Sequence, residues 1–93
     1  MKTLFIINPV AGRKRSVKVW KDIRPYINFP YEYEFTQGCG DATQIAKHAK
    51  KLGYEVIVTV GGDGTISEVV NGIAGSDIRL GIIPAGTGND FGK

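Results

Sequence analysis

Val56-Ile57-Val58-Thr59-Val60, followed directly by Gly61-Gly62-Asp63-Gly64-Thr65, carries the strongest structural signal in the chain. The first five residues form an apolar run of strand length, and apolar side chains then recur at helical spacing over residues 66–73. Glycines between a strand and a helix let the backbone turn sharply and approach a ligand closely. The free N–H groups of the first helical turn favour an anion. The stretch therefore predicts a phosphate site.

Asp63 is an unusual residue for a loop that only binds phosphate, because a carboxylate repels phosphate oxygens. Its presence makes better sense if the site also handles a metal ion or a proton. Both roles fit a carboxylate at this position. We expect Asp63 to take part in the chemistry, either as an organiser of Mg²⁺ and phosphate or as the general base.

The size and composition of the chain limit its class. The 93 residues, 42% of them apolar, are enough for one small domain. The single cysteine, Cys39, excludes an internal disulfide framework and fits a reducing compartment. No apolar run approaches the roughly 20 residues of a membrane span. We therefore expect a cytoplasmic protein.

The charge is distributed unevenly along the chain. Residues 1–30 contain seven Lys or Arg against one acid, whereas residues 31–93 contain five against eight. The basic stretch Arg13–Arg24 could contact nucleotide phosphates, an anionic membrane surface or nucleic acid. It lacks the interleaved aromatics and the recognisable fold of a nucleic-acid surface, so we expect no nucleic-acid partner.

Strand and helix patterns alternate along the chain. Ser16 is expected to cap the first helix, and Asp41 with Gln44 to form a capping box at the start of the second. Tyr31-Glu32-Tyr33-Glu34-Phe35 alternates strictly, as in an edge strand with one buried face. The expected strands span residues 4–7, 31–35, 55–60 and 79–83, with a third helix over residues 65–72.

This alternation predicts an α/β fold with a parallel sheet built from right-handed βαβ units. The amphipathic second strand belongs at an edge, which favours the strand order 2-1-3-4. The fold is then an open three-layer sheet of the Rossmann-like or flavodoxin-like kind. Ligands of such sheets bind at the carboxyl ends of the strands beside the point where the strand order reverses. Three glycine-containing loops, at residues 8–12, 61–65 and 86–90, are therefore expected to converge on one crevice.

Better-known phosphate motifs do not fit this sequence. The loop after the first strand has one glycine, Gly12, and lacks the spacing of a Walker-type loop. The nearest match to G-x-G-x-x-G begins at Gly62 and has Ser67 where glycine or alanine belongs. The H-R-D and D-F-G sequences of protein kinases are absent as well.

A combination of four motifs does match a known family. The chain resembles the diacylglycerol kinase catalytic domain, a family of lipid kinases that includes sphingosine and ceramide kinases, with NAD kinases as more distant relatives. The resemblance spans the whole chain, in the family's order. It is carried by Asn8-Pro9-Val10-Ala11-Gly12, Gly61-Gly62-Asp63-Gly64-Thr65, Glu68-Val69-Val70-Asn71-Gly72 and Pro84-Ala85-Gly86-Thr87-Gly88-Asn89-Asp90-Phe91.

The resemblance implies phosphorylation of a lipid hydroxyl by ATP with Mg²⁺, as in phospholipid biosynthesis. It implies that Thr36, near the end of the second strand, contacts ATP. Asp63 is the implied catalytic residue and, as an alternative, the Mg²⁺ ligand. The nucleotide-binding residues implied are Asn8, Pro9, Val10, Ala11, Gly12, Thr36, Gly61, Gly62, Asp63, Gly64, Thr65, Ile66, Ser67, Gly86, Thr87, Gly88 and Asn89.

Family members continue into a β-rich lipid-binding domain, so residues 1–93 resemble only the N-terminal, nucleotide-binding lobe. We expect this lobe alone to bind nucleotide weakly and to phosphorylate nothing. The expected partners are a lipid substrate and, transiently, a membrane surface, with the protein peripheral to that membrane. The open sheet edge would also allow a homodimer. Two alternatives stay open: a small-molecule kinase of the NAD kinase type and a non-catalytic nucleotide-binding module.

Overall fold

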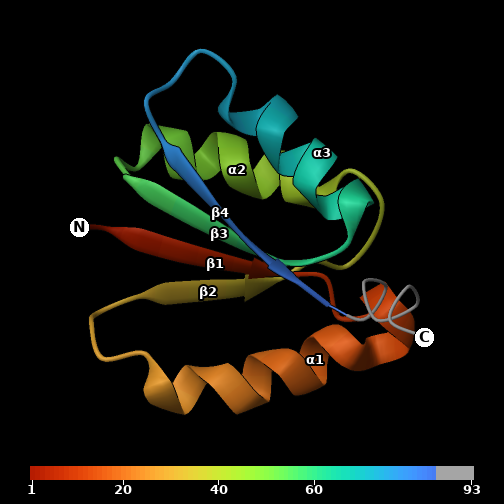
Figure 1. Ribbon diagram of the computed structural model, residues 1–93. Helices are drawn as coiled ribbons and strands as arrows, with labels where there is room; N and C mark the ends of the chain where they lie inside the picture. The colour runs from red at the N-terminus through yellow and green to blue at the C-terminus, as the bar shows by residue number, and fades with distance from the viewer. Residues whose placement is uncertain (86–93) are drawn as a thin grey trace.

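A computed structural model describes residues 1–85 as a three-layer α/β structure. Its four parallel strands lie in the order β2-β1-β3-β4, which confirms the predicted order (Figure 1). The elements along the chain are β1 (Thr3–Ile7), α1 (Ala11–Ile23), the short 3₁₀ helix η1 (Arg24–Tyr26), β2 (Glu32–Phe35), α2 (Asp41–Lys51), β3 (Val56–Gly61), α3 (Asp63–Ile73) and β4 (Arg79–Pro84).

Alternate side chains of β1 pack on opposite faces of the sheet. Leu4 and Ile6 lie in the core cluster formed with α2 and α3, whereas Phe5 and Ile7 lie in the cluster formed with Trp20 of α1. All five β1 side chains are buried, as expected for a strand covered on both faces. Figure 1 shows α1 below the sheet and α2 and α3 above it. None of the helices in residues 1–85 is long and apolar enough to span a bilayer.

The start of α1 differs from the expectation. Ser16 is not its N-cap, because the helix begins at Ala11 and passes through three residues in the left-handed region, Gly12, Arg13 and Lys14. Ser16 is fully buried inside the helix, and its hydroxyl donates to the backbone oxygen of Asn8. The N-cap position is held by Val10, and no side chain makes a capping hydrogen bond to the first turn.

The strand β2 lies at the sheet edge as predicted, but its expected buried face is only partly covered. Tyr33 and Phe35 are 41% and 39% exposed. Tyr33 packs against Trp20 at a ring-centroid distance of 5.3 Å, and the guanidinium of Arg24 lies 4.6 Å from the Tyr33 ring centroid. The aromatic face therefore contacts α1 and its C-terminal turn while its outer edge stays exposed.

Candidate functional site

The loops that follow β1, β2 and β3 leave the sheet side by side. Backbone hydrogen bonds extend the sheet pairing by one residue: Asn8 N donates to Val60 O at 3.0 Å, and Thr36 N donates to Ile7 O at 2.8 Å. The loops therefore start in register at the carboxyl ends of the strands, on the right of the sheet in Figure 1. This is the rim at which open α/β sheets bind ligands.

Asn8 connects the first loop to the start of α3. Its side-chain amide donates to Thr65 Oγ1 at 3.2 Å, and its side-chain oxygen accepts from Val10 N at 3.1 Å. Gly61 lies beneath this contact, where a Cβ would come within 2.9 Å of Thr65 Oγ1. A residue without a side chain is therefore required at position 61 for the two loops to meet as they do.

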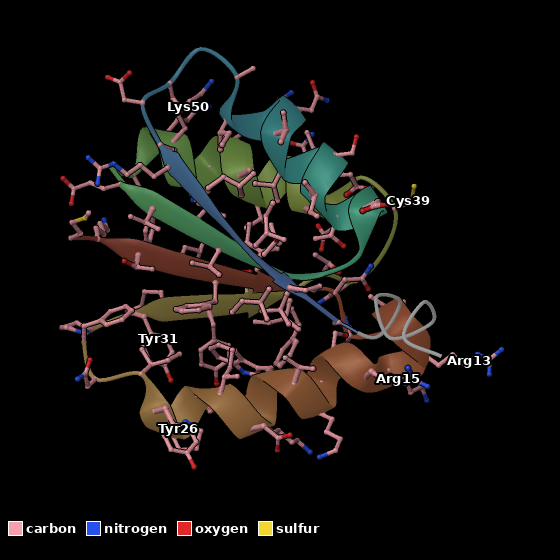
Figure 2. The ribbon with its side chains drawn as sticks, viewed as in Figure 1. Arg13, Arg15, Tyr26, Tyr31, Cys39 and Lys50 are labelled. Atoms are coloured by element: carbon pink, nitrogen blue, oxygen red, sulfur yellow. The ribbon has the colours of Figure 1, made fainter. Side chains whose placement is uncertain are left out.

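A left-handed turn follows the first loop and carries basic side chains. Arg13 and Lys14 have φ of 57° and 72°, values that cost a non-glycine residue about 1–2 kcal/mol each. Figure 2 shows the side chains of Arg13 and Arg15 pointing outward from this end of α1. Strained backbone concentrates at functional sites, and here it directly follows Gly12, which lines the cleft described below.

The start of α3 presents backbone donors to the same rim. Gly62 is the N-cap, in extended conformation and without a side-chain cap, and Thr65 N and Ile66 N bond to its carbonyl oxygen. The first N–H groups of any helix have no partner inside the helix. A Cβ built on Gly62 or Gly64 would meet nothing within 4 Å, and both glycines line the cleft described below. The geometry suits a phosphate group.

The loop between β2 and α2 forms the opposite wall. The N-cap of α2 is Gly40, in the left-handed conformation, so the capping box expected from Asp41 and Gln44 is wrong. The carboxylate of Asp41 accepts from Gln37 N at 2.8 Å instead. The cap comes from another helix: Glu68 of α3 accepts hydrogen bonds from the α2 start.

These elements enclose an open cleft of about 610 Å³. Nine of the implied nucleotide-binding residues line it: Asn8, Pro9, Val10, Ala11, Gly12, Thr36, Gly62, Gly64 and Thr65. Four others, Gly61, Asp63, Ile66 and Ser67, are not part of its lining. Gly86, Thr87, Gly88 and Asn89 lie outside the described residues.

Five further residues line the cleft that the sequence did not identify as ligand contacts: Gln37, Gly38, Cys39, Ala42 and Glu68. The position of Thr36 already indicated that the next residues leave the sheet at the same rim. Figure 2 shows Cys39 beside the first turn of α3. Glu68 belongs to a quoted motif, but its contact with α2 depends on tertiary packing.

Asp63 is the first residue of α3, and its side chain is exposed at the rim between Gly62 and Gly64. Within residues 1–85 there is no group of three or more His, Cys, Asp or Glu that could hold a metal ion. A metal ion near Asp63 would therefore need ligands from a bound phosphate, from water or from elsewhere. A single exposed carboxylate beside a helix N-terminus fits such shared coordination.

Comparison with known proteins agrees with this geometry. Residues 2–93 match the family described as the diacylglycerol kinase catalytic domain. The diacylglycerol kinase of Staphylococcus aureus (strain MRSA252) is 53% identical over 94 residues, and that of Bacillus subtilis (strain 168) is 43% identical over 94 residues. Both alignments cover 96% of this chain, but only 30% and 31% of the respective relatives.

A solved structure gives the same result. The crystal structure of a diacylglycerol kinase from Bacillus anthracis str. Sterne superposes with a TM-score of 0.78 at 39% identity. The superposition covers 97% of this chain and 35% of the solved chain, so the present chain spans about a third of the length of its relatives. This chain belongs to the diacylglycerol kinase catalytic domain family.

Proposed function

We propose that this chain is the ATP-binding part of a lipid kinase that transfers the γ-phosphate of ATP to the hydroxyl of a diacylglycerol-like lipid. The observation that carries the proposal is the single cleft into which the first loop, the α3 start and the β2–α2 loop all open. Phosphoryl transfer depends mainly on positioning and charge neutralisation. A cleft with helix N–H donors at one end and hydroxyl groups in its wall supplies both.

In this proposal the phosphates lie over the start of α3. The amides of Asp63 and Gly64 would donate to them, because the first helical turn has no internal acceptors for these groups. Thr36 and Asn8 would add polar contacts from neighbouring strands. Gly86–Asn89 stays a predicted further contact.

Asp63, at the rim, is the proposed catalytic group, since the acid that lines the cleft, Glu68, is already occupied. Both carboxylate oxygens of Glu68 accept backbone hydrogen bonds from the start of α2. In residues 1–85 no hydrogen bond to a protein partner is assigned to the Asp63 carboxylate. Mg²⁺, when bound, would neutralise charge on the phosphate oxygens, and Asp63 is the residue that could hold it there.

The family match supports a lipid acceptor over the NAD kinase alternative. The relatives are named as diacylglycerol kinases, and that acceptor is carried to this chain by similarity alone. Phosphorylation of NAD in preference to diacylglycerol by an enzyme containing this chain would favour the alternative. Nucleotide binding without transfer to either acceptor would favour a non-catalytic module.

A titration with MgATP tests the nucleotide site directly. We expect the backbone amide resonances of Gly12, Gly62 and Gly64 to shift saturably, because these residues line the cleft. Gly53 and Gly75 follow α2 and α3 at the opposite rim and serve as internal controls. Unchanged resonances at all three cleft glycines, or shifts as large at the two controls, would contradict the proposal.

The basic outer face of α1 is proposed to orient this lobe on an anionic membrane. Lys18 and Lys21 are exposed on this helix, and Lys18 pairs with Asp22 at 3.1 Å in an exposed i,i+4 bridge. Each basic residue near an anionic surface contributes about 1 kcal/mol. Substitution of both lysines by Gln is therefore expected to lower affinity for phosphatidylglycerol vesicles by about 10- to 30-fold.

The matched control for vesicle binding is the pair Lys47→Gln and Lys51→Gln on α2. It removes the same charge from the helix layer on the other side of the sheet. Cosedimentation with phosphatidylglycerol vesicles measures both pairs. Equal losses for the two pairs would mean that only net charge matters, and the proposed orientation would then be wrong.

A further inference from the structure

Glu68 is a residue of α3 whose carboxylate caps a different helix. Its Oε2 accepts from Gly40 N at 3.0 Å, and its Oε1 accepts from Ala42 N at 3.2 Å. Both donors belong to the start of α2, and Glu68 also lines the cleft. We infer that Glu68 is a specificity-determining residue: it occupies the anion-binding end of α2, and so leaves the start of α3 as the phosphate position. This inference rests on the proposed function.

Two helix N-termini open onto the cleft, and each would attract an anion by itself. The aligned peptide dipoles give every helix start a partial positive charge, and its first N–H groups lack internal partners. At α3, Gly62, Gly64 and Thr65 line the cleft, and no side chain caps the helix. At α2 the carboxylate of Glu68 is already bound, and Asp41 adds a second negative charge there. A phosphate at the α2 start would meet two carboxylates and few free donors.

The position of Glu68 is fixed by packing around it. Thr43 Oγ1 donates to the backbone oxygen of Glu68 at 2.8 Å. One turn further along α3, Gly72 lies so close to α2 that a Cβ there would come within 2.6 Å of Thr43 O and of Ala46 Cβ. The two helices therefore dock at Gly72, and Glu68 reaches the α2 start from this fixed contact. The first and last residues of the motif Glu68-Val69-Val70-Asn71-Gly72 therefore each have a structural role: Glu68 caps α2, and Gly72 lets the two helices approach closely.

The Glu68 carboxylate also ties the cleft wall to α3. Within residues 1–85, segment 37–41 makes only backbone hydrogen bonds to other parts of the chain besides those to Glu68. These backbone bonds lie within α2 or go to its first turn. The Sγ of Cys39 lies 4.0 Å from Glu68 Oε2. Loss of the carboxylate would expose the N–H groups of Gly40 and Ala42 to solvent and to added anions.

Inorganic pyrophosphate is the probe that distinguishes the two helix starts. In the unsubstituted chain, pyrophosphate is expected to shift the amide resonances of Gly62 and Gly64 and to leave those of Gly40 and Ala42 unchanged. In Glu68→Ala, saturable shifts at Gly40 and Ala42 are expected in addition, of the same order as those at Gly62. A role for Glu68 in stability alone would not create a new response to an anion.

Two further variants guard against misinterpretation. Glu68→Gln keeps one carbonyl acceptor for the α2 start, so its response at Gly40 should be intermediate, and it serves if Glu68→Ala fails to fold. Glu55→Gln removes a carboxylate that accepts from Lys2 N at 3.0 Å, at the amino end of β3, and should behave as the unsubstituted chain. Thermal melting checks that each variant is folded.

The outcomes separate this inference from the proposed function. Absence of a response at Gly62 and Gly64 in the unsubstituted chain contradicts the proposed phosphate site, whatever Glu68 does. Absence of any new response at Gly40 and Ala42 in folded Glu68→Ala and Glu68→Gln overturns the role assigned to Glu68, even with the α3 site intact. Responses at Gly40 in the unsubstituted chain would overturn it as well.

Discussion

An Asp63→Asn variant is expected to lose most of its phosphoryl transfer activity, by about 10²- to 10⁴-fold in turnover, while it keeps its fold. The magnitude is that of removing a positioned proton acceptor, and loss of a Mg²⁺-organising carboxylate would act in the same direction. Asparagine has nearly the same shape as aspartate, and Asp63 is exposed, so packing is unchanged. Turnover is measured as transfer of radiolabelled phosphate from ATP to diacylglycerol in vesicles, by an enzyme that contains this chain.

The matched control is Asp77→Asn, which removes an exposed carboxylate just before β4 that is not among the residues lining the cleft. It should retain full turnover. The dependence of the residual activity on Mg²⁺ separates the two roles of Asp63. A metal-organising role predicts that Asp63→Asn needs more Mg²⁺ for half-maximal rate, whereas a general-base role predicts an unchanged requirement. Near-normal turnover would remove Asp63 from the mechanism.

The fold was predictable because its main signals are local and agree with one another. The alternation in residues 31–35 identified an edge strand, and the continuous apolar runs identified central ones. With right-handed crossovers, this information leaves the order 2-1-3-4 as the favoured arrangement. The degree of exposure of β2 was not predictable, since it depends on how far α1 reaches across Tyr33 and Phe35.

Helix starts were predicted less well, because their caps are not local here. Ser16 and Asp41 have the residue types of N-caps, yet each makes a different hydrogen bond. The left-handed residues Arg13 and Lys14 have no sequence signal, because only glycine, asparagine and aspartate favour that region. At the start of α2, a side chain from another helix takes the place of the expected local cap.

In the candidate site, too, the features that follow from strand order were predictable, and those that depend on contacts between distant segments were not. The loops at residues 8–12 and 62–65 could be placed together, because the carboxyl ends of parallel strands share one rim. The part of the wall formed by Gln37, Gly38 and Cys39 follows from the topology but carries no motif. Glu68 belongs to a motif of the sequence, but its hydrogen bonds to the start of α2 depend on how the two helices pack.

A Gly72→Ala variant is expected to lose about 1–3 kcal/mol of unfolding free energy, the usual cost of overpacking. The new Cβ would lie 2.6 Å from the backbone oxygen of Thr43 and 2.6 Å from Ala46 Cβ, and 3.3 Å from Lys47 N. Two of these three atoms are backbone, so α2 must shift as a unit. The higher helix propensity of alanine, worth about 1 kcal/mol, offsets only part of this cost. Urea denaturation measures the change.

Gly64→Ala is the matched control, because it makes the same substitution in the same helix. A Cβ at position 64 meets nothing within 4 Å, so the variant should be as stable as the unsubstituted chain or more so. Its methyl group would instead occupy space in the cleft and weaken MgATP binding. Gly72→Ala should weaken binding only by moving α2, and with it the donors that Glu68 holds. Equal stability losses for the two variants would show that close helix contact at Gly72 is not what this glycine provides.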